Sequence, residues 1–267
     1  MRNLRKIASS LVPRGVEDRD LVQVLEEIGN PMWRNYLEKW FVREGFHKVS
    51  DVVASYYAAL MEFDSAFGDF LKFLEDQGLL DRVLIIVTSD HGESLGEHGI
   101  YFDHHGLYEV SLRVPFALYF EPLGRGIAKG TLMHVDVPYI VSEILNLRYD
   151  ISGAAHGYGL SSLMDSDPRE NDVLTFLETY TEAKIAFKFG EYKLIRSLGI
   201  RESICKYCMK IHGGLVELYN LRKDPSEVHN VYDSYDNVVK LMTKLTSKEF
   251  VRFRALYTMY KRGRLRP

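Results

Sequence analysis

The sequence has little of several features that identify whole classes of protein. Its 267 residues include only two cysteines, Cys205 and Cys208, too few for a disulfide framework. No apolar run approaches the roughly 18 residues that a membrane span needs. The basic amino terminus also lacks the apolar segment of a signal peptide. These absences argue against a disulfide-stapled or membrane-spanning protein. They favour a cytoplasmic location, unless an export signal lies on an upstream segment.

A strong excess of one charge is also missing. The chain has 34 Lys and Arg against 37 Asp and Glu, which gives a net charge of −3. Nucleic-acid-binding domains are usually basic, so the balance gives no case for a nucleic acid partner. The apolar content of 46% and charged content of 27% are ordinary for a globular protein. The length predicts one large domain or two modest ones.

The most informative stretch is a polar loop directly after an apolar strand. Residues 83–87 are apolar and rich in β-branched side chains, and the run TSDHGESLGEHG at 88–99 follows at once. In open α/β sheets, ligands bind at the carboxyl ends of the strands. Asp90 offers a hard oxygen donor and His91 a nitrogen donor, so the pair is a candidate site for a divalent cation. A polar turn without a ligand is the alternative interpretation.

Periodicity predicts the elements around this loop. Apolar residues recur three and four apart over residues 51–77, which predicts one long helix, capped by Asp51 and ended by Gly78. The apolar runs 83–87 and 114–120 predict strands buried on both faces. The long connection between these strands holds the whole candidate site, as long connections in compact domains often do.

The sequence pattern changes after about residue 165. The segments 183–189 and 191–197 flank Gly190 and predict a β-hairpin. Residues 215–221 predict a further strand, and residues 235–260 a helix. The carboxyl-terminal part is therefore expected to be a small antiparallel sheet with a helix.

The residues around the Asp-His pair carry a resemblance to a known family. The sequence shows in order YAA at 57–59, SDHGE at 89–93, GEHG at 96–99, HHGLYE at 104–109, LRVP at 112–115, VDVP at 135–138 and ELYNL at 217–221. This series resembles the later part of the sulfatase family, within the alkaline-phosphatase superfamily. The resemblance implies an α/β fold, with a mixed sheet sandwiched by helices and a small antiparallel-sheet-plus-helix subdomain. Three segments are expected: a flexible amino terminus (1–16), a partial sulfatase-like α/β domain with the metal-site loop (17–165) and the carboxyl-terminal subdomain (166–267).

One part of the family pattern is not seen. Family members begin with a strand carrying metal-binding carboxylates, followed by a nucleophile motif of the form Cys/Ser-x-Pro-Ser-Arg. Residues 10–14 (SLVPR) are only superficially similar, because Pro13 abuts Arg14 and no strand precedes them. The chain thus resembles the carboxyl-terminal half to two-thirds of a sulfatase. An upstream segment or a partner chain would have to supply the nucleophile.

The resemblance implies a metal-dependent hydrolase acting on a small-molecule or glycan sulfate or phosphate ester. Asp90 and His91 would bind a divalent metal: manganese, zinc, magnesium or calcium, with the imidazole favouring the first three. The catalytic candidates His104 and His105 would bind the ester oxygen or protonate the leaving group, and the motif spacing favours His104. Arg113 would line the substrate pocket or form a structural salt bridge.

Two alternatives stay open at this point. The chain could be a non-catalytic remnant that binds an anion or a partner subunit, with an uncovered apolar surface that favours a homo-oligomer or a companion subunit. Separately, Cys205-x-x-Cys208 with His212 has partial zinc-site spacing, but no second Cys pair supplies a fourth ligand. Free thiols or a redox pair are the other interpretations of the two cysteines.

Overall fold

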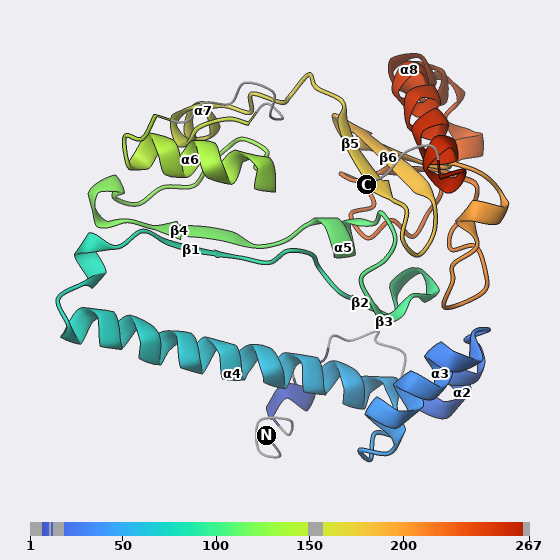
Figure 1. Ribbon diagram of the computed structural model, residues 1–267, viewed down its shortest axis with the longest axis horizontal. Helices are drawn as coiled ribbons and strands as arrows, with labels where there is room; N and C mark the ends of the chain where they lie inside the picture. Colours follow the sequence, from blue (N-terminus) through green and yellow to red (C-terminus); the bar gives the residue numbers. More distant parts are fainter. Residues whose placement is uncertain (1–6, 11, 13–18, 149–156, 264–267) are drawn as a thin grey trace. The chain divides into compact units, whose positions relative to one another are not determined.

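The computed structural model describes residues 7–10, 12, 19–148 and 157–263 (Figure 1). Most of the segment 1–16 that was expected to be flexible, including much of SLVPR, lies outside the described residues. The chain forms two compact units. Unit 1 contains residues 1–123, 178–184 and 199–215, and unit 2 contains residues 124–177, 185–198 and 216–267. No helix of the described part is long and apolar enough to cross a membrane.

Unit 1 consists of helices, two short strand pairs and the turns between them. In chain order these are α2 (Leu21–Glu26), α3 (Pro31–Leu37), a π-helical turn (Glu38–Val42), α4 (Val49–Asp76), β1 (Ile85–Thr88), β2 (Ser94–Leu95), β3 (Tyr101–Asp103), α5 (Glu109–Leu112) and β4 (Phe116–Tyr119). The elements wholly or mainly in unit 2 are α6 (Val137–Ile144), α7 (Leu160–Asp165), β5 (Leu174–Glu178), β6 (Lys184–Phe189), β7 (Tyr192–Ser197), β8 (Val216–Asn220) and α8 (Asp236–Lys261).

The long helix α4 is confirmed, with a start two residues earlier than predicted. Asp51 lies within the first turn, where its Oδ2 accepts hydrogen bonds from the backbone N–H groups of His47 and Lys48, both at 2.9 Å. It therefore caps the helix from inside rather than from the position before it. Gly78 has a φ of +64°, the left-handed conformation in which glycine ends a helix.

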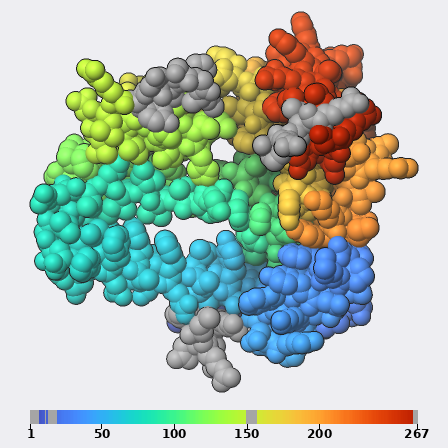
Figure 2. All heavy atoms as spheres, in the orientation of Figure 1, coloured from blue at the N-terminus to red at the C-terminus, as the bar shows by residue number. Residues whose placement is uncertain are grey.

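The apolar face of α4 is buried only in part. Its buried residues are Val49, Val52, Val53, Ala54, Ala58 and Leu74, whereas Phe63 and Phe73 are more than half exposed. Figure 2 shows an opening between α4 and the segment with β1, both in unit 1. A helix of 28 residues is roughly 42 Å long. Much of its apolar face is therefore exposed in the described part of the chain.

The strands β1 and β4 pair antiparallel, from Ile85 opposite Tyr119 to Thr88 opposite Phe116. Residues of β4 alternate between half-buried and exposed, and β1 has no fully buried residue. The prediction that both strands are buried on both faces is wrong, because the sheet that the described residues form here has only these two strands. The pairing still brings Thr88 close to Pro115: the Thr88 hydroxyl donates a hydrogen bond of 2.9 Å to the Pro115 carbonyl oxygen. The loop between the strands therefore starts and finishes at one end of the pair.

The small antiparallel sheet with one helix that was predicted for the carboxyl-terminal part is confirmed, although unit 2 also includes residues 124–165 and leaves out 178–184 and 199–215. Its sheet has the order β5-β6-β7-β8, and Gly190 turns between β6 and β7 with a φ of +54°. The helix α8 buries one stripe of residues: Met242, Thr246, Phe250 and Tyr257. The Arg196 guanidinium of β7 lies 3.7 Å from the centre of the Phe250 ring, so the stripe faces the sheet. A small antiparallel sheet covered by one helix is the result.

A buried ion pair fixes the start of α6 in unit 2. Arg169 donates two hydrogen bonds to the Asp136 carboxylate, at 2.9 and 2.5 Å, and both side chains are at least 94% buried. The same carboxylate accepts from the backbone N–H groups of Met133 and Tyr158, at 2.7 and 2.8 Å. Asp136 is thus satisfied on both oxygens, which is the condition under which a buried carboxylate is tolerated.

We expect Arg169→Leu to lower the free energy of unfolding by about 3–5 kcal/mol, because the Asp136 carboxylate would stay buried without its countercharge. Urea denaturation followed by circular dichroism measures the loss. Arg252→Leu is the matched control, because it removes an exposed pair with Glu249 on α8 and such pairs contribute little. Equal losses in the two variants would contradict the prediction.

Candidate functional site

The loop between β1 and β4 folds back on itself. Its strands β2 and β3 pair with Ser94 opposite Asp103, and the Gly92 N–H donates to the Ser111 carbonyl at 2.9 Å. A Cβ atom at Gly92 would lie 2.0 Å from the Val110 carbonyl oxygen. Only glycine fits so close to this backbone. The fold-back brings the SDHGE and HHGLYE stretches to the same place.

Three donor side chains meet there. The rings of His91 and His104 stack with centroids 3.9 Å apart, and His104 Nδ1 lies 3.8 Å from Glu93 Oε2. One donor atom from each of these three residues lies within 4.8 Å of the others. Asp90 is exposed beside them, with its Oδ2 3.5 Å from His91 Nε2. The structure therefore brings Asp90, His91 and His104, all singled out in the sequence, into one cluster with Glu93.

The local hydrogen bonds orient His91. Its Nδ1 lies 2.8 Å from the Gly92 carbonyl oxygen. Because a carbonyl oxygen only accepts, Nδ1 carries the proton and donates, which leaves Nε2 as the electron-pair donor on the side of Asp90. A ligating imidazole usually has this second hydrogen bond, since it fixes the tautomer and the ring.

The carboxylates of the cluster have different electrostatics. Burial raises the pKa of Glu93 to about 7, and the neighbouring negative charge of Asp103 adds to the rise. His91 lowers the pKa of the exposed Asp90 carboxyl. Tyr56 on α4 faces the same region, where burial and the charge of Glu93 raise the pKa of its hydroxyl. At neutral pH Asp90 is ionised and Glu93 is near its titration midpoint.

These donors fit a divalent cation. Two ligands on one zinc- or manganese-sized ion, each about 2.0–2.2 Å from it, lie roughly 3–4 Å apart. The Asp90–His91 separation of 3.5 Å is in that range, and the His91, Glu93 and His104 atoms need shifts of only about an ångström. Carboxylate oxygen with imidazole nitrogen suits zinc or manganese better than calcium, which prefers oxygen ligands alone.

The other two predicted site residues lie elsewhere. His105 is buried with its Nε2 3.4 Å from Cys205 Sγ and its Nδ1 3.4 Å from Asp103 Oδ2, so it is in contact with the cysteines. Arg113 is exposed just beyond the end of α5. The structure thus separates His104 from His105, although the two are adjacent in the chain.

Glu93, Asp103 and Tyr56 were not assigned roles from the sequence. Glu93 belongs to the SDHGE stretch, so its position next to Asp90 was a usable signal. The burial that sets its electrostatics depends on β3 and α5 folding over it, which no local pattern reports.

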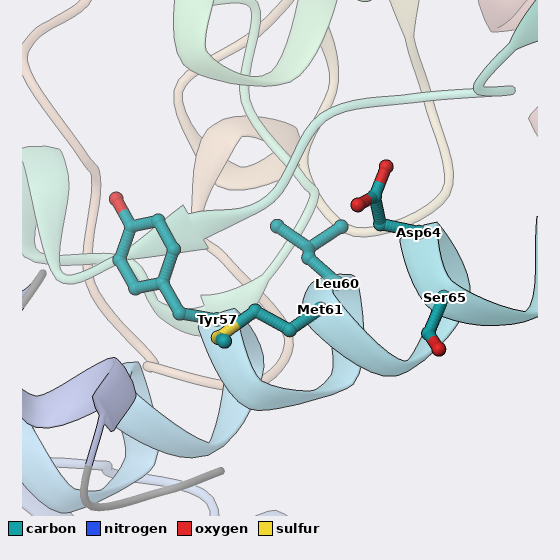
Figure 3. Close-up of a pocket in the computed structure, with 5 residues that line it drawn as sticks. All are labelled: Tyr57, Leu60, Met61, Asp64 and Ser65. Atoms are coloured by element: carbon teal, nitrogen blue, oxygen red, sulfur yellow. The ribbon is translucent and has the colours of Figure 1, made fainter. Parts of the chain in front are cut away.

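A separate hollow lies along α4. It is lined by Tyr57, Leu60, Met61, Asp64 and Ser65, all from that helix (Figure 3). It offers one carboxylate and no imidazole. The loop after β1, with its two histidines and two carboxylates, is the better candidate for chemistry.

Replacing Gly92 with alanine should lower the free energy of unfolding by about 1–3 kcal/mol, because the added methyl would overlap the Val110 carbonyl. Gly68→Ala on α4 is the matched control. A Cβ atom there meets nothing within 4 Å, and alanine in a helix interior should stabilise by about 0.5–1 kcal/mol. Thermal unfolding of both variants measures the difference. A Gly92→Ala protein as stable as the parent would show that the loop is not folded back in this way.

Comparison with known sequences finds a family model that resembles the first half of the chain. The family model described as Sulfatase matches residues 17–147. Arylsulfatase K of Xenopus laevis is 27% identical over 200 residues, which is 74% of this chain and 37% of that protein. The N-acetylglucosamine-6-O-sulfatase of Bacteroides thetaiotaomicron is 23% identical over 190 residues, 69% of this chain and 33% of that protein. The chain spans about a third of the length of these relatives.

Comparison with solved structures shows the fold. A structure described as BT4656 in complex with its substrate D-glucosamine-2-N,6-O-disulfate matches with a TM-score of 0.59 and 21% identity, over 79% of this chain and 42% of that one. The phosphonate monoester hydrolase of Agrobacterium radiobacter matches with a TM-score of 0.56 and 20% identity, over 78% of this chain and 42% of that one. The expected mixed α/β fold is confirmed.

Proposed function

Because residues 17–147 match the family model described as Sulfatase and resemble arylsulfatases, we propose that this chain carries the metal- and ester-binding part of a sulfuric ester hydrolase. The observation that carries the proposal is the meeting of Asp90, His91 and His104 in the loop after β1. Such a set at the end of a strand combines cation ligands with an imidazole that can bind an ester oxygen or donate a proton to it.

Each residue of the cluster would have a different role in ester hydrolysis. Asp90 and His91 would hold a divalent cation, which when bound supplies positive charge against the non-bridging oxygens of the ester. His104 is about half exposed, so its imidazole can reach a substrate from solvent. It would bind an ester oxygen or protonate the leaving group. Glu93, with its Oε2 3.8 Å from His104 Nδ1, would orient the ring.

The nucleophile would come from an upstream segment or from a partner chain. The proposed substrate is a sulfate ester of a small molecule or a glycan, which is supported by the names of the relatives, N-acetylglucosamine-6-O-sulfatase among them. A phosphate ester has the same tetrahedral, oxygen-rich anion, and the same donors would bind it. Turnover assays with both ester classes distinguish these substrates.

Asp90→Ala should abolish tight binding of one divalent ion, because the substitution removes the ionised carboxylate 3.5 Å from His91 Nε2. Isothermal titration with Mn²⁺ measures the change. Asp64→Ala is the matched control, since Asp64 is an exposed acid on α4 and should leave the titration unchanged. Equal affinity in the Asp90→Ala and parent proteins would contradict the metal assignment.

His104→Gln should lower kcat for aryl sulfate hydrolysis by about 10²–10⁴-fold, as removal of a general acid typically does. The assay uses the chain together with the upstream segment or partner chain that supplies the nucleophile. His47→Gln is the control and should retain full turnover, since His47 is exposed and lies just before α4. A His104→Gln protein with undiminished kcat would remove His104 from the mechanism.

One observation favours a second function. The exposed apolar residues of α4 suit a non-catalytic remnant that associates with a second copy of the chain. Under that alternative no sulfate or phosphate ester is turned over with any added segment, and light scattering reports a dimer at micromolar concentration.

A further inference from the structure

We propose that His105, Cys205, Cys208 and His212 form a structural zinc site within unit 1. All four side chains are buried, and one donor atom of each lies within 4.8 Å of the others. Two thiolates and two imidazoles in such a set are a ligand combination of four-coordinate structural zinc. The sequence offers three of the ligands at zinc-like spacing. The fold supplies the fourth, His105, from one hundred residues upstream.

The donor separations suit a tetrahedral ion. With Zn–S of about 2.3 Å and Zn–N of about 2.0 Å, the ligand atoms of a tetrahedral site lie roughly 3.3–3.8 Å apart. His105 Nε2 is 3.4 Å from Cys205 Sγ, within that range. The backbone N–H groups of Tyr207 and Cys208 point at the same sulfur, at 3.4 and 3.3 Å. Hydrogen bonds to a sulfur favour its thiolate form, which is the form that binds zinc.

Both imidazoles have an oxygen near the nitrogen that faces away from the sulfurs. His212 Nδ1 lies 3.1 Å from the His98 carbonyl oxygen, within hydrogen-bond distance. Asp103 Oδ2 lies 3.4 Å from His105 Nδ1, close enough for an ion pair, although neither atom makes a hydrogen bond within the described residues. Metal-ligating histidines usually donate this second N–H to a carboxylate or a carbonyl. The arrangement leaves the Nε2 atoms of both rings as electron-pair donors toward the cysteines.

One of these atoms is otherwise unexplained. His212 Nε2 is fully buried and has no hydrogen-bond partner in the described part of the chain. A buried polar atom without a partner is costly, and such atoms are rare in folded proteins. A zinc ion at the centre of the four donors would satisfy it.

The charges of the cluster also call for a cation. Glu182, close by and buried, has no hydrogen-bond partner for either carboxylate oxygen within the described residues, although Lys184 Nζ is 3.7 Å away. Two thiolates with one Zn²⁺ ion are neutral overall, so the ion would add no uncompensated charge to this buried place.

The site would tie the candidate active loop to a distant segment of unit 1. His105 directly follows His104, and the other three ligands lie in residues 199–215. Zinc would hold His105 inward and thereby set the backbone from which His104 projects. The zinc site does not depend on the proposed hydrolase function, because a non-catalytic chain would need the same link between this loop and residues 199–215.

The experiment measures metal on the full chain, purified under reducing conditions with zinc and then dialysed. We expect one zinc retained per chain by elemental mass spectrometry. We also expect a thiolate-to-metal charge-transfer band in the near ultraviolet when Co²⁺ replaces it. Cys205→Ser and Cys208→Ser should lose the band. Asp90→Ala should keep it, which separates this site from the ester site.

Ser203→Ala is the matched control for local packing. Ser203 is buried in the same segment, where its hydroxyl donates to the Ala183 and Gly199 carbonyls, but it offers no thiol. This variant should keep both zinc and the cobalt band. If a cysteine variant does not fold, the cobalt spectrum of the unaltered chain still decides. An unaltered chain without retained zinc and without a thiolate band overturns the proposal, as does a Cys205→Ser protein that retains zinc equally well.

Discussion

The contact between His105 and Cys205 is the one on which the arrangement of the candidate site depends. It buries a polar ring in the loop after β3 and joins that loop to a segment one hundred residues away. His105 is buried, whereas the neighbouring His104 is about half exposed and stacked on His91. One buried contact thus sets which of two adjacent histidines can meet a substrate and which is enclosed.

The elements that the sequence predicted correctly are those with local causes. Gly78 ends α4 and Gly190 forms the turn of the β6–β7 hairpin, and each has the left-handed backbone conformation that glycine adopts readily. Both positions can be recognised from a few neighbouring residues. The burial of those elements was predicted less well. Phe63 on α4 has the spacing of a core residue, yet it is exposed, since burial requires a neighbouring layer that the two-stranded β1–β4 pair does not provide.

The candidate site was predictable in the same way: the residues of local motifs could be found from the sequence, but their burial and long-range contacts could not. Asp90, His91 and His104 were found from the SDHGE and HHGLYE stretches, and the structure brings them together. Glu93 acquires its role only through burial, and the pairing of His105 with the cysteines spans a distance in sequence that no motif covers. Arg113 matched the family pattern, but its side chain is exposed beyond the end of α5. The sequence motifs therefore identified the loop that contains the candidate site, and the fold determined which of its side chains lie together.

X-ray absorption at the zinc edge tests most directly whether zinc binds to the two cysteines with His105 and His212. If it does, the cluster of Asp90, His91 and His104 stays free for an ester. The chain is loaded with one equivalent of zinc. The account predicts two sulfur neighbours at about 2.3 Å and two nitrogen neighbours at about 2.0 Å. A spectrum with only oxygen and nitrogen neighbours would contradict it, because zinc would then sit among Asp90, His91 and His104 and the cysteines would hold no metal.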